Sequence, residues 1–170
     1  MEANDGICML MRYTDWANRM LYQALEPLPE QAVCEPKPGR PGGIMGVMGH
    51  IFVVGSIWKA HMTGVAHGYE SRQLPVAVPL EELRLRQAQL DRWYTEFAQL
   101  QTPQALAKPI DFLFVDGGKG RMQIGQMLAH VANHATYHRG YVADMLYEAG
   151  GAPPTMDIPV FVRHESALRV

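Results

Sequence analysis

The spacing of apolar residues along the chain predicts four helices of roughly twenty residues each. In the first, apolar residues recur every three or four positions from Leu10 to Leu25, and Pro27 stops it. The second carries the run IMGVMGHIFVVGSIW, which is apolar on nearly all sides and is typical of a helix enclosed by neighbours. Paired glycines and paired prolines end the fourth. The predicted helices cover residues 5–26, 43–62, 79–101 and 124–149.

The third helix is expected to lie on the outside of the fold. Leu83, Leu90 and Tyr94 fall on one apolar stripe, whereas Arg84 and Asp91 belong to the polar residues that cover most of the remaining surface. A helix with one apolar stripe packs that stripe inward and leaves the other face in water.

The connections between these helices indicate how they are arranged. Residues 28–43 and 67–79 are rich in proline and glycine and predict long linkers, while residues 109–123 contain a DGGKG turn and predict a small β-hairpin before the last helix. The residues from 156 to the end show no clear period. Linkers of this length favour an all-α fold in one domain spanning residues 1–170, a four-helix bundle with a long crossover connection.

Composition and charge narrow the class of protein. The 170 residues carry 15 basic and 17 acidic side chains, a net charge of −2, which argues against a nucleic-acid partner. Two cysteines, Cys8 and Cys34, are too few for a disulfide scaffold and are expected to be reduced thiols. The acidic N-terminus does not resemble a signal peptide, and the most apolar run is shorter than a membrane span. A soluble, cytoplasmic protein with no membrane partner is expected.

Three histidines recur at four-residue intervals in the last long helix: His130, His134 and His138. His134 and His138 both lie on the three- and four-residue stripe that points into a bundle core, and His130 falls to one side. Neighbours four residues apart face nearly the same way, so the pair can share one metal ion. Buried imidazoles without partners cost stability, and a metal ion would satisfy one nitrogen of each.

A third metal ligand is expected from another core position. His50 interrupts the most apolar helix, where a lone histidine is hard to satisfy, and its position lets it face the last helix. Three imidazoles leave a coordination position open on zinc, nickel or a similar cation, as in a catalytic site.

A simpler interpretation stays open, in which His134 and His138 are core histidines with ordinary hydrogen bonds, because HxxxH is a short pattern. His130 is expected beside the site or on the surface, and three other histidines are expected to be solvated: His61, His67 and His164. Ala135 occupies the position of the zincin general base, so peptide hydrolysis by that mechanism is not supported.

Four segments in series carry a family resemblance: RYTDWANRMLYQAL, GHIFVVGSIWKAHMTG, HVANHATYHRG and DIPVFVR. Together they resemble the DinB/YfiT-like family of metalloenzymes across almost the whole chain. The resemblance implies a four-helix bundle that forms a homodimer and holds zinc or nickel on His50, His134 and His138. One departure is Tyr141, since the family often has Gln after HRG.

The resemblance also implies a class of activity. Characterised relatives are mainly metal-dependent enzymes that use a low-molecular-weight thiol for S-transfer or isomerisation of a small-molecule substrate. The alternative is a non-catalytic bundle of a stress response, dimeric and stapled by metal or binding a ligand. No catalytic residue is assigned; Tyr137, Arg139 and Tyr141 either orient a substrate or are structural.

Overall fold

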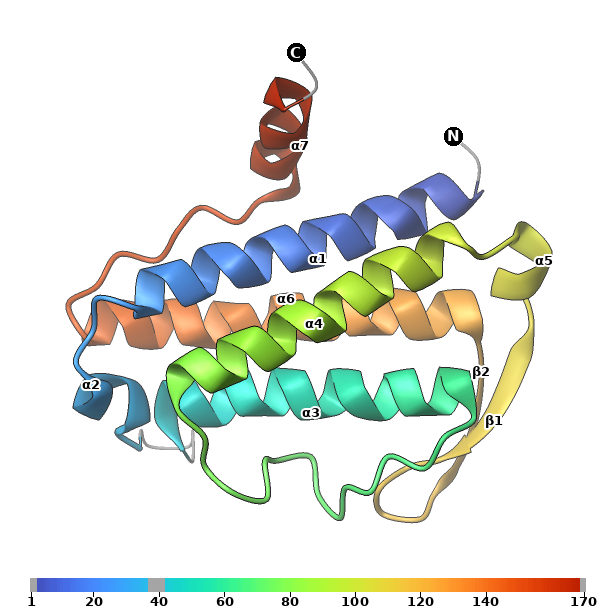
Figure 1. The fold of residues 1–170 in the computed structure, drawn as a ribbon, viewed down its shortest axis with the longest axis horizontal. Coiled ribbons are helices and arrows are strands. Elements are labelled where there is room, and N and C mark those ends of the chain that lie inside the picture. The colour runs from blue at the N-terminus through green and yellow to red at the C-terminus, as the bar shows by residue number, and fades with distance from the viewer. Residues whose placement is uncertain (1–2, 37–41, 169–170) are drawn as a thin grey trace.

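The computed structural model describes residues 3–36 and 42–168 and shows a bundle of four long helices (Figure 1). Each predicted helix is confirmed to within two residues at either end. The four are α1 (Ala3–Leu25), α3 (Gly43–Thr63), α4 (Leu80–Gln99) and α6 (Ile124–Glu148).

The long crossover lies between α3 and α4. In the bundle α1 packs against α4 and α6, and α3 packs against the same two helices. Helices α3 and α4 run in one direction, opposite to α1 and α6, so residues 64–79 travel back along the bundle before α4 begins (Figure 1). Gly64 ends α3 in the left-handed conformation, with a φ of 70°.

The predicted hairpin is also confirmed, as the antiparallel strands β1 (Pro109–Leu113) and β2 (Lys119–Gln123). It follows the short helix α5 (Pro103–Leu106), which the sequence pattern did not predict. Phe112 of β1 packs edge-on against Trp58 of α3, with ring centroids 4.9 Å apart. Gly120 faces Phe112 across the hairpin, and a Cβ there would lie 2.4 Å from the Phe112 ring, so the hairpin needs glycine at this position.

Two further helices occupy segments that were expected to be irregular. Helix α2 (Glu30–Cys34) lies within the predicted linker, of which residues 37–41 are outside the described residues. Helix α7 (Ile158–Ala167) occupies the C-terminal segment that shows no clear period. Phe161 of α7 packs against Tyr13 and Trp16 of α1. At ten residues α7 is too short for its period to be clear in the sequence, and contact with α1 stabilises it.

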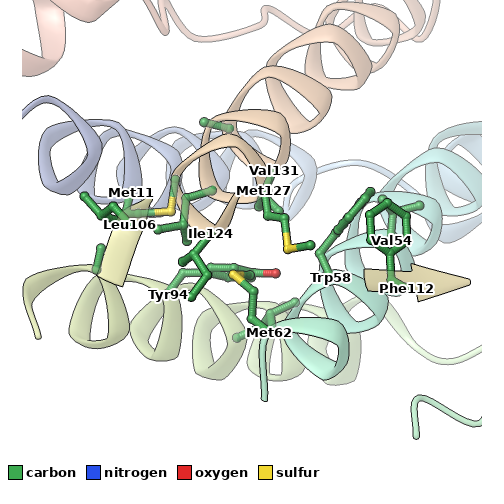
Figure 2. Packing of buried hydrophobic residues seen from close by; sticks show 14 residues of the cluster. Met11, Val54, Trp58, Met62, Tyr94, Leu106, Phe112, Ile124, Met127 and Val131 are labelled. Carbon is green, nitrogen blue, oxygen red and sulfur yellow. The ribbon is translucent and has the colours of Figure 1, made fainter. Parts of the chain in front are cut away.

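The interior of the bundle is mostly aliphatic, aromatic and methionine side chains. Figure 2 shows one part of this core, where Trp58 lies beside Val54 and Phe112, and Met62 approaches Tyr94. Helix α3 is the one described helix that is long and apolar enough to cross a membrane, but 61% of the relevant window is buried inside the bundle. Its apolar surface therefore contributes to the protein core, as the sequence predicts for a central helix.

Polar side chains also form a connected group inside the bundle. Asp91 is only 4% exposed, so its predicted place on the solvent face of α4 is wrong. Its carboxylate accepts hydrogen bonds from Asn18 and Gln87, both at 2.8 Å. Arg139, also buried, donates to Asn18 at 2.9 Å and to Thr136 at 2.8 Å. The amide of Asn18 thus links a buried carboxylate to a buried guanidinium.

Candidate metal centre

Helices α3 and α6 bring together the three histidines that the sequence analysis selected. His50 comes from α3, and His134 and His138 come from successive turns of α6. One ring nitrogen of each lies within 4.8 Å of the corresponding nitrogens of the other two, and all three side chains are half-buried. The Nε2 atoms of His50 and His134 are 3.1 Å apart. The predicted convergence of the three rings is therefore confirmed.

The geometry and the donor chemistry fit a divalent cation. A tetrahedral zinc ion holds nitrogen ligands at about 2.0–2.1 Å, which separates two ligand nitrogens by roughly 3.4 Å. The 3.1 Å between His50 and His134 is close to that separation, and the upper limit of 4.8 Å needs only a small inward movement of the rings. Within the described part of the chain no carboxylate or thiol joins the three nitrogens. Three imidazoles alone leave a position for another ligand.

The crossover between α3 and α4 orients the ring of His50. Its Nδ1 donates a hydrogen bond to the backbone carbonyl of Arg72 at 2.7 Å. A proton on Nδ1 leaves the lone pair on Nε2, which faces His134 and is the atom suited to bind a cation. The sequence analysis did not find this partner, because a backbone carbonyl has no side-chain signature.

The surroundings keep the imidazoles neutral. Burial, with a smaller effect of the neighbouring histidines, lowers the pKa of His134 to about 3. Burial, with a smaller effect of His50, lowers the pKa of His138 to about 4. The pKa of His50 is lowered as well, mainly by burial. Neutral imidazole is the form that binds a metal ion, so these rings are prepared for ligation at neutral pH.

These shifts predict that the metal-free protein becomes less stable in mild acid. Unfolding returns His134 and His138 to an ordinary pKa of about 6.5, so the unfolded chain takes up protons that the folded chain excludes. Their contribution to stability is complete above about pH 6.5 and is lost as the pH falls toward 4. We expect the free energy of unfolding, measured by urea denaturation with a chelator present, to fall across this range.

The matched variant for this prediction is His134→Gln with His138→Gln, which should have a smaller loss of stability between pH 7 and pH 4.5. Comparison with the parent protein is needed because burial raises the pKa of Asp91 to about 7, an effect of opposite sign in the same range. Equal pH dependence in the variant and the parent would contradict the prediction.

The remaining histidines lie outside the triad. The ring of His130 is half-buried, 5.6 Å from that of His134 and 4.9 Å from that of Trp58, so it lies beside the site as expected. His164 is exposed, as expected. His61 and His67 were expected to be solvated, but both are half-buried with their rings perpendicular and 5.6 Å apart, because the crossover folds back over the end of α3.

Two of the three polar residues near the triad border it from the outside. Tyr137 is 61% exposed, and its hydroxyl is hydrogen-bonded to that of Tyr141. Their rings lie 5.1 and 5.8 Å from the ring of His138. Arg139 is different: at 2% exposed and directed toward α1, it cannot contact a substrate from solvent, so its role is structural.

The sequence analysis missed the polar residues behind the triad, although a signal for them was present. Gln87 and Asp91 follow Leu83 at intervals of four, on the stripe that also holds Leu90 and Tyr94. Polar residues on such a stripe are buried, and buried polar groups need partners. Helical periodicity places Gln87 and Asp91 on the inward-facing side of α4. Asp91 was nevertheless assigned to the solvent face, because it is polar.

Comparison with known proteins places the chain in a family. The family model described as "DinB family" matches residues 1–167. The chain is also 26% identical over 165 residues to Protein DinB of Bacillus subtilis (strain 168), an alignment that covers 94% of this chain and 95% of the relative. The fold, the three histidines and the match over almost the whole sequence lead to one conclusion: the chain belongs to the DinB family.

Proposed function

We propose that this protein is a metal-dependent enzyme whose cation is held by His50, His134 and His138. The observation that carries the proposal is the convergence of three neutral imidazoles without a fourth protein donor among the described residues. Structural zinc sites usually have four protein ligands, whereas catalytic sites keep a position for water or substrate. A divalent cation at this position would lower the pKa of a water or thiol that binds it.

Transfer of a low-molecular-weight thiol to a small electrophile is the activity that we favour. Three imidazoles suit zinc or nickel, and a thiolate is a good additional ligand for either ion. In the reaction the thiol loses its proton, its sulfur forms a bond to an electrophilic carbon, and the leaving group departs with its bonding electrons. The related possibility is an isomerisation in which the thiol adds to the substrate without displacing a group and is released again when the isomer forms. The hydroxyls of Tyr137 and Tyr141 would orient the substrate beside His138.

A pocket along the helix that carries His50, although none of the three histidines lines it, has room for a small apolar group. It has a volume of about 380 Å3 and is lined by Gly49, the residue before His50, together with Met45, Leu74 and Val78. Pockets for small molecules have volumes of about 300–1,000 Å3 and mostly apolar walls. This pocket would accommodate the apolar part of the electrophile.

The proposal is tested by elemental analysis of protein purified without a metal-binding tag, followed by thiol-transfer assays. We expect about one zinc or nickel ion per chain, and thiol transfer to an alkylating electrophile that a chelator abolishes and added metal restores. A protein without metal, or one whose thiol transfer is unchanged by the chelator, would contradict the proposed function.

A further inference from the structure

A small cavity lies between the four long helices, behind the metal centre. All four long helices contribute to its wall, including Asn18 of α1, Gly55 of α3, Gln87 and Asp91 of α4, and His134 of α6. The space open to the centre of a water molecule is about 10 Å3. That is close to the size of a single water site. The cavity therefore lies between a candidate metal ligand and the buried polar group.

A buried acceptor without a partner lines this cavity. Gln87 is 3% exposed, and its Nε2 donates to Asp91 at 2.8 Å. Its Oε1 has no hydrogen-bond partner within the part of the chain that the structure describes. A buried carbonyl oxygen left in this state destabilises the folded protein, and proteins usually satisfy such an atom with an ordered water.

When it binds a cation, His134 needs a hydrogen-bond acceptor, whereas Gln87 Oε1 needs a donor. Its Nε2 faces Nε2 of His50, on the side where a cation would bind. When Nε2 of a neutral imidazole is a metal ligand, Nδ1 carries the proton and needs an acceptor. No residue in 3–36 or 42–168 accepts a hydrogen bond from Nδ1 of His134. His50 has such an acceptor in the carbonyl of Arg72.

We propose that one water molecule in this cavity accepts a hydrogen bond from His134 Nδ1 and donates one to Gln87 Oε1. Gln87 is then a positioning residue, which holds the ring of His134 in its ligating tautomer and orientation through the water. Gln87 donates a hydrogen bond to Asp91, and Asp91 accepts another from Asn18, so hydrogen bonds connect the water to the buried polar group. The hydrogen bond donated by His134 Nδ1 and the effect on metal binding rest on the proposed function, whereas a water that joins Gln87 Oε1 to the ring of His134 does not.

The first test compares two variants on the same helix by chelator competition for zinc, at a temperature where circular dichroism shows both to be folded. Gln87→Met keeps the size of the side chain but removes both the acceptor Oε1 and the Nε2 group that donates to Asp91, and we expect zinc affinity to fall about 10–100-fold. Leu83→Ala is the matched control, because Leu83 is fully buried one turn earlier on α4 and does not line the cavity. Its zinc affinity should stay within about threefold of the parent value. Equal losses in the two variants would overturn the proposal.

The second measurement does not depend on any variant. A high-resolution crystal structure of the zinc-loaded protein should show a water within hydrogen-bond distance of His134 Nδ1 and Gln87 Oε1. An empty cavity, or His134 Nδ1 bonded to another atom, would overturn the proposal. If the protein binds no metal, the proposed function fails, and electron density in the cavity of the metal-free crystal still decides whether the water joins these two residues.

Discussion

His134→Ala is expected to eliminate stoichiometric metal binding while the protein remains folded. The ring of His134 lies 4.9 Å from that of His50 and 4.4 Å from that of His138. Its loss leaves two imidazoles on different helices, which do not make a stable site for zinc at neutral pH. We expect zinc affinity in chelator competition to fall by at least about 100-fold, because the roughly 10–16 kcal/mol of a structural zinc site amounts to about 2.5–4 kcal/mol for each of its four ligands.

The matched control for this prediction is His130→Ala. His130 is also half-buried, lies one turn earlier on α6 and is outside the triad. It should keep about one metal ion per chain. If His130→Ala loses metal as readily as His134→Ala, the ion is bound elsewhere and the assignment of the triad is wrong.

The same variant separates the two interpretations of the metal. If His134→Ala and the metal-free parent keep their helical content and cooperative unfolding, the ion is not required for folding and the enzyme interpretation gains support. If both unfold, the cation acts as a structural staple between α3 and α6. The homodimer implied by the family resemblance stays a prediction, which sedimentation of the purified protein would test.

Asp91→Ala is expected to destabilise the protein by about 3–5 kcal/mol, because it removes a buried carboxylate that accepts two hydrogen bonds and is connected through Asn18 to a buried guanidinium. The substitution leaves the guanidinium of Arg139, 2% exposed, without its nearby carboxylate. It also deprives the amides of Asn18 and Gln87 of their acceptor. Urea denaturation at pH 8, above the raised pKa of Asp91, measures the loss while the parent carboxylate is charged.

Asp111→Ala is the surface comparison, because Asp111 pairs with Arg121 at 3.2 Å and both side chains are mostly exposed. A surface ion pair contributes about 0–1 kcal/mol, so little change is expected. The double variant Asp91→Leu with Arg139→Met should recover part of the stability, since no buried charge is then left unpaired, while the amides of Asn18 and Gln87 still lack their acceptor. A loss for Asp91→Ala no larger than that for Asp111→Ala would show that the buried charges are not coupled.

The long helices and the metal triad could be predicted from the sequence because both depend on local periodicity. Intervals of three and four residues place His134 and His138 on one face of α6 whatever the helix packs against. His50 could be selected because a histidine in an otherwise apolar helix needs a partner. The crossover followed from linker length. These features are properties of single segments, which the sequence specifies directly.

Other features depend on contacts between segments that are far apart in the chain, and only the tertiary structure decided them. Asp91 looked like a surface residue because it is polar, and the group it joins, its donor Asn18 and the Arg139 that donates to Asn18, comes from two other helices. Helix α7 exists because Phe161 finds Tyr13 and Trp16 on α1. Helical periodicity in the sequence determined which residues face the interior, because it fixes the side of a helix on which each residue lies. The tertiary structure determined which of these residues are in contact, because that depends on how the helices pack together.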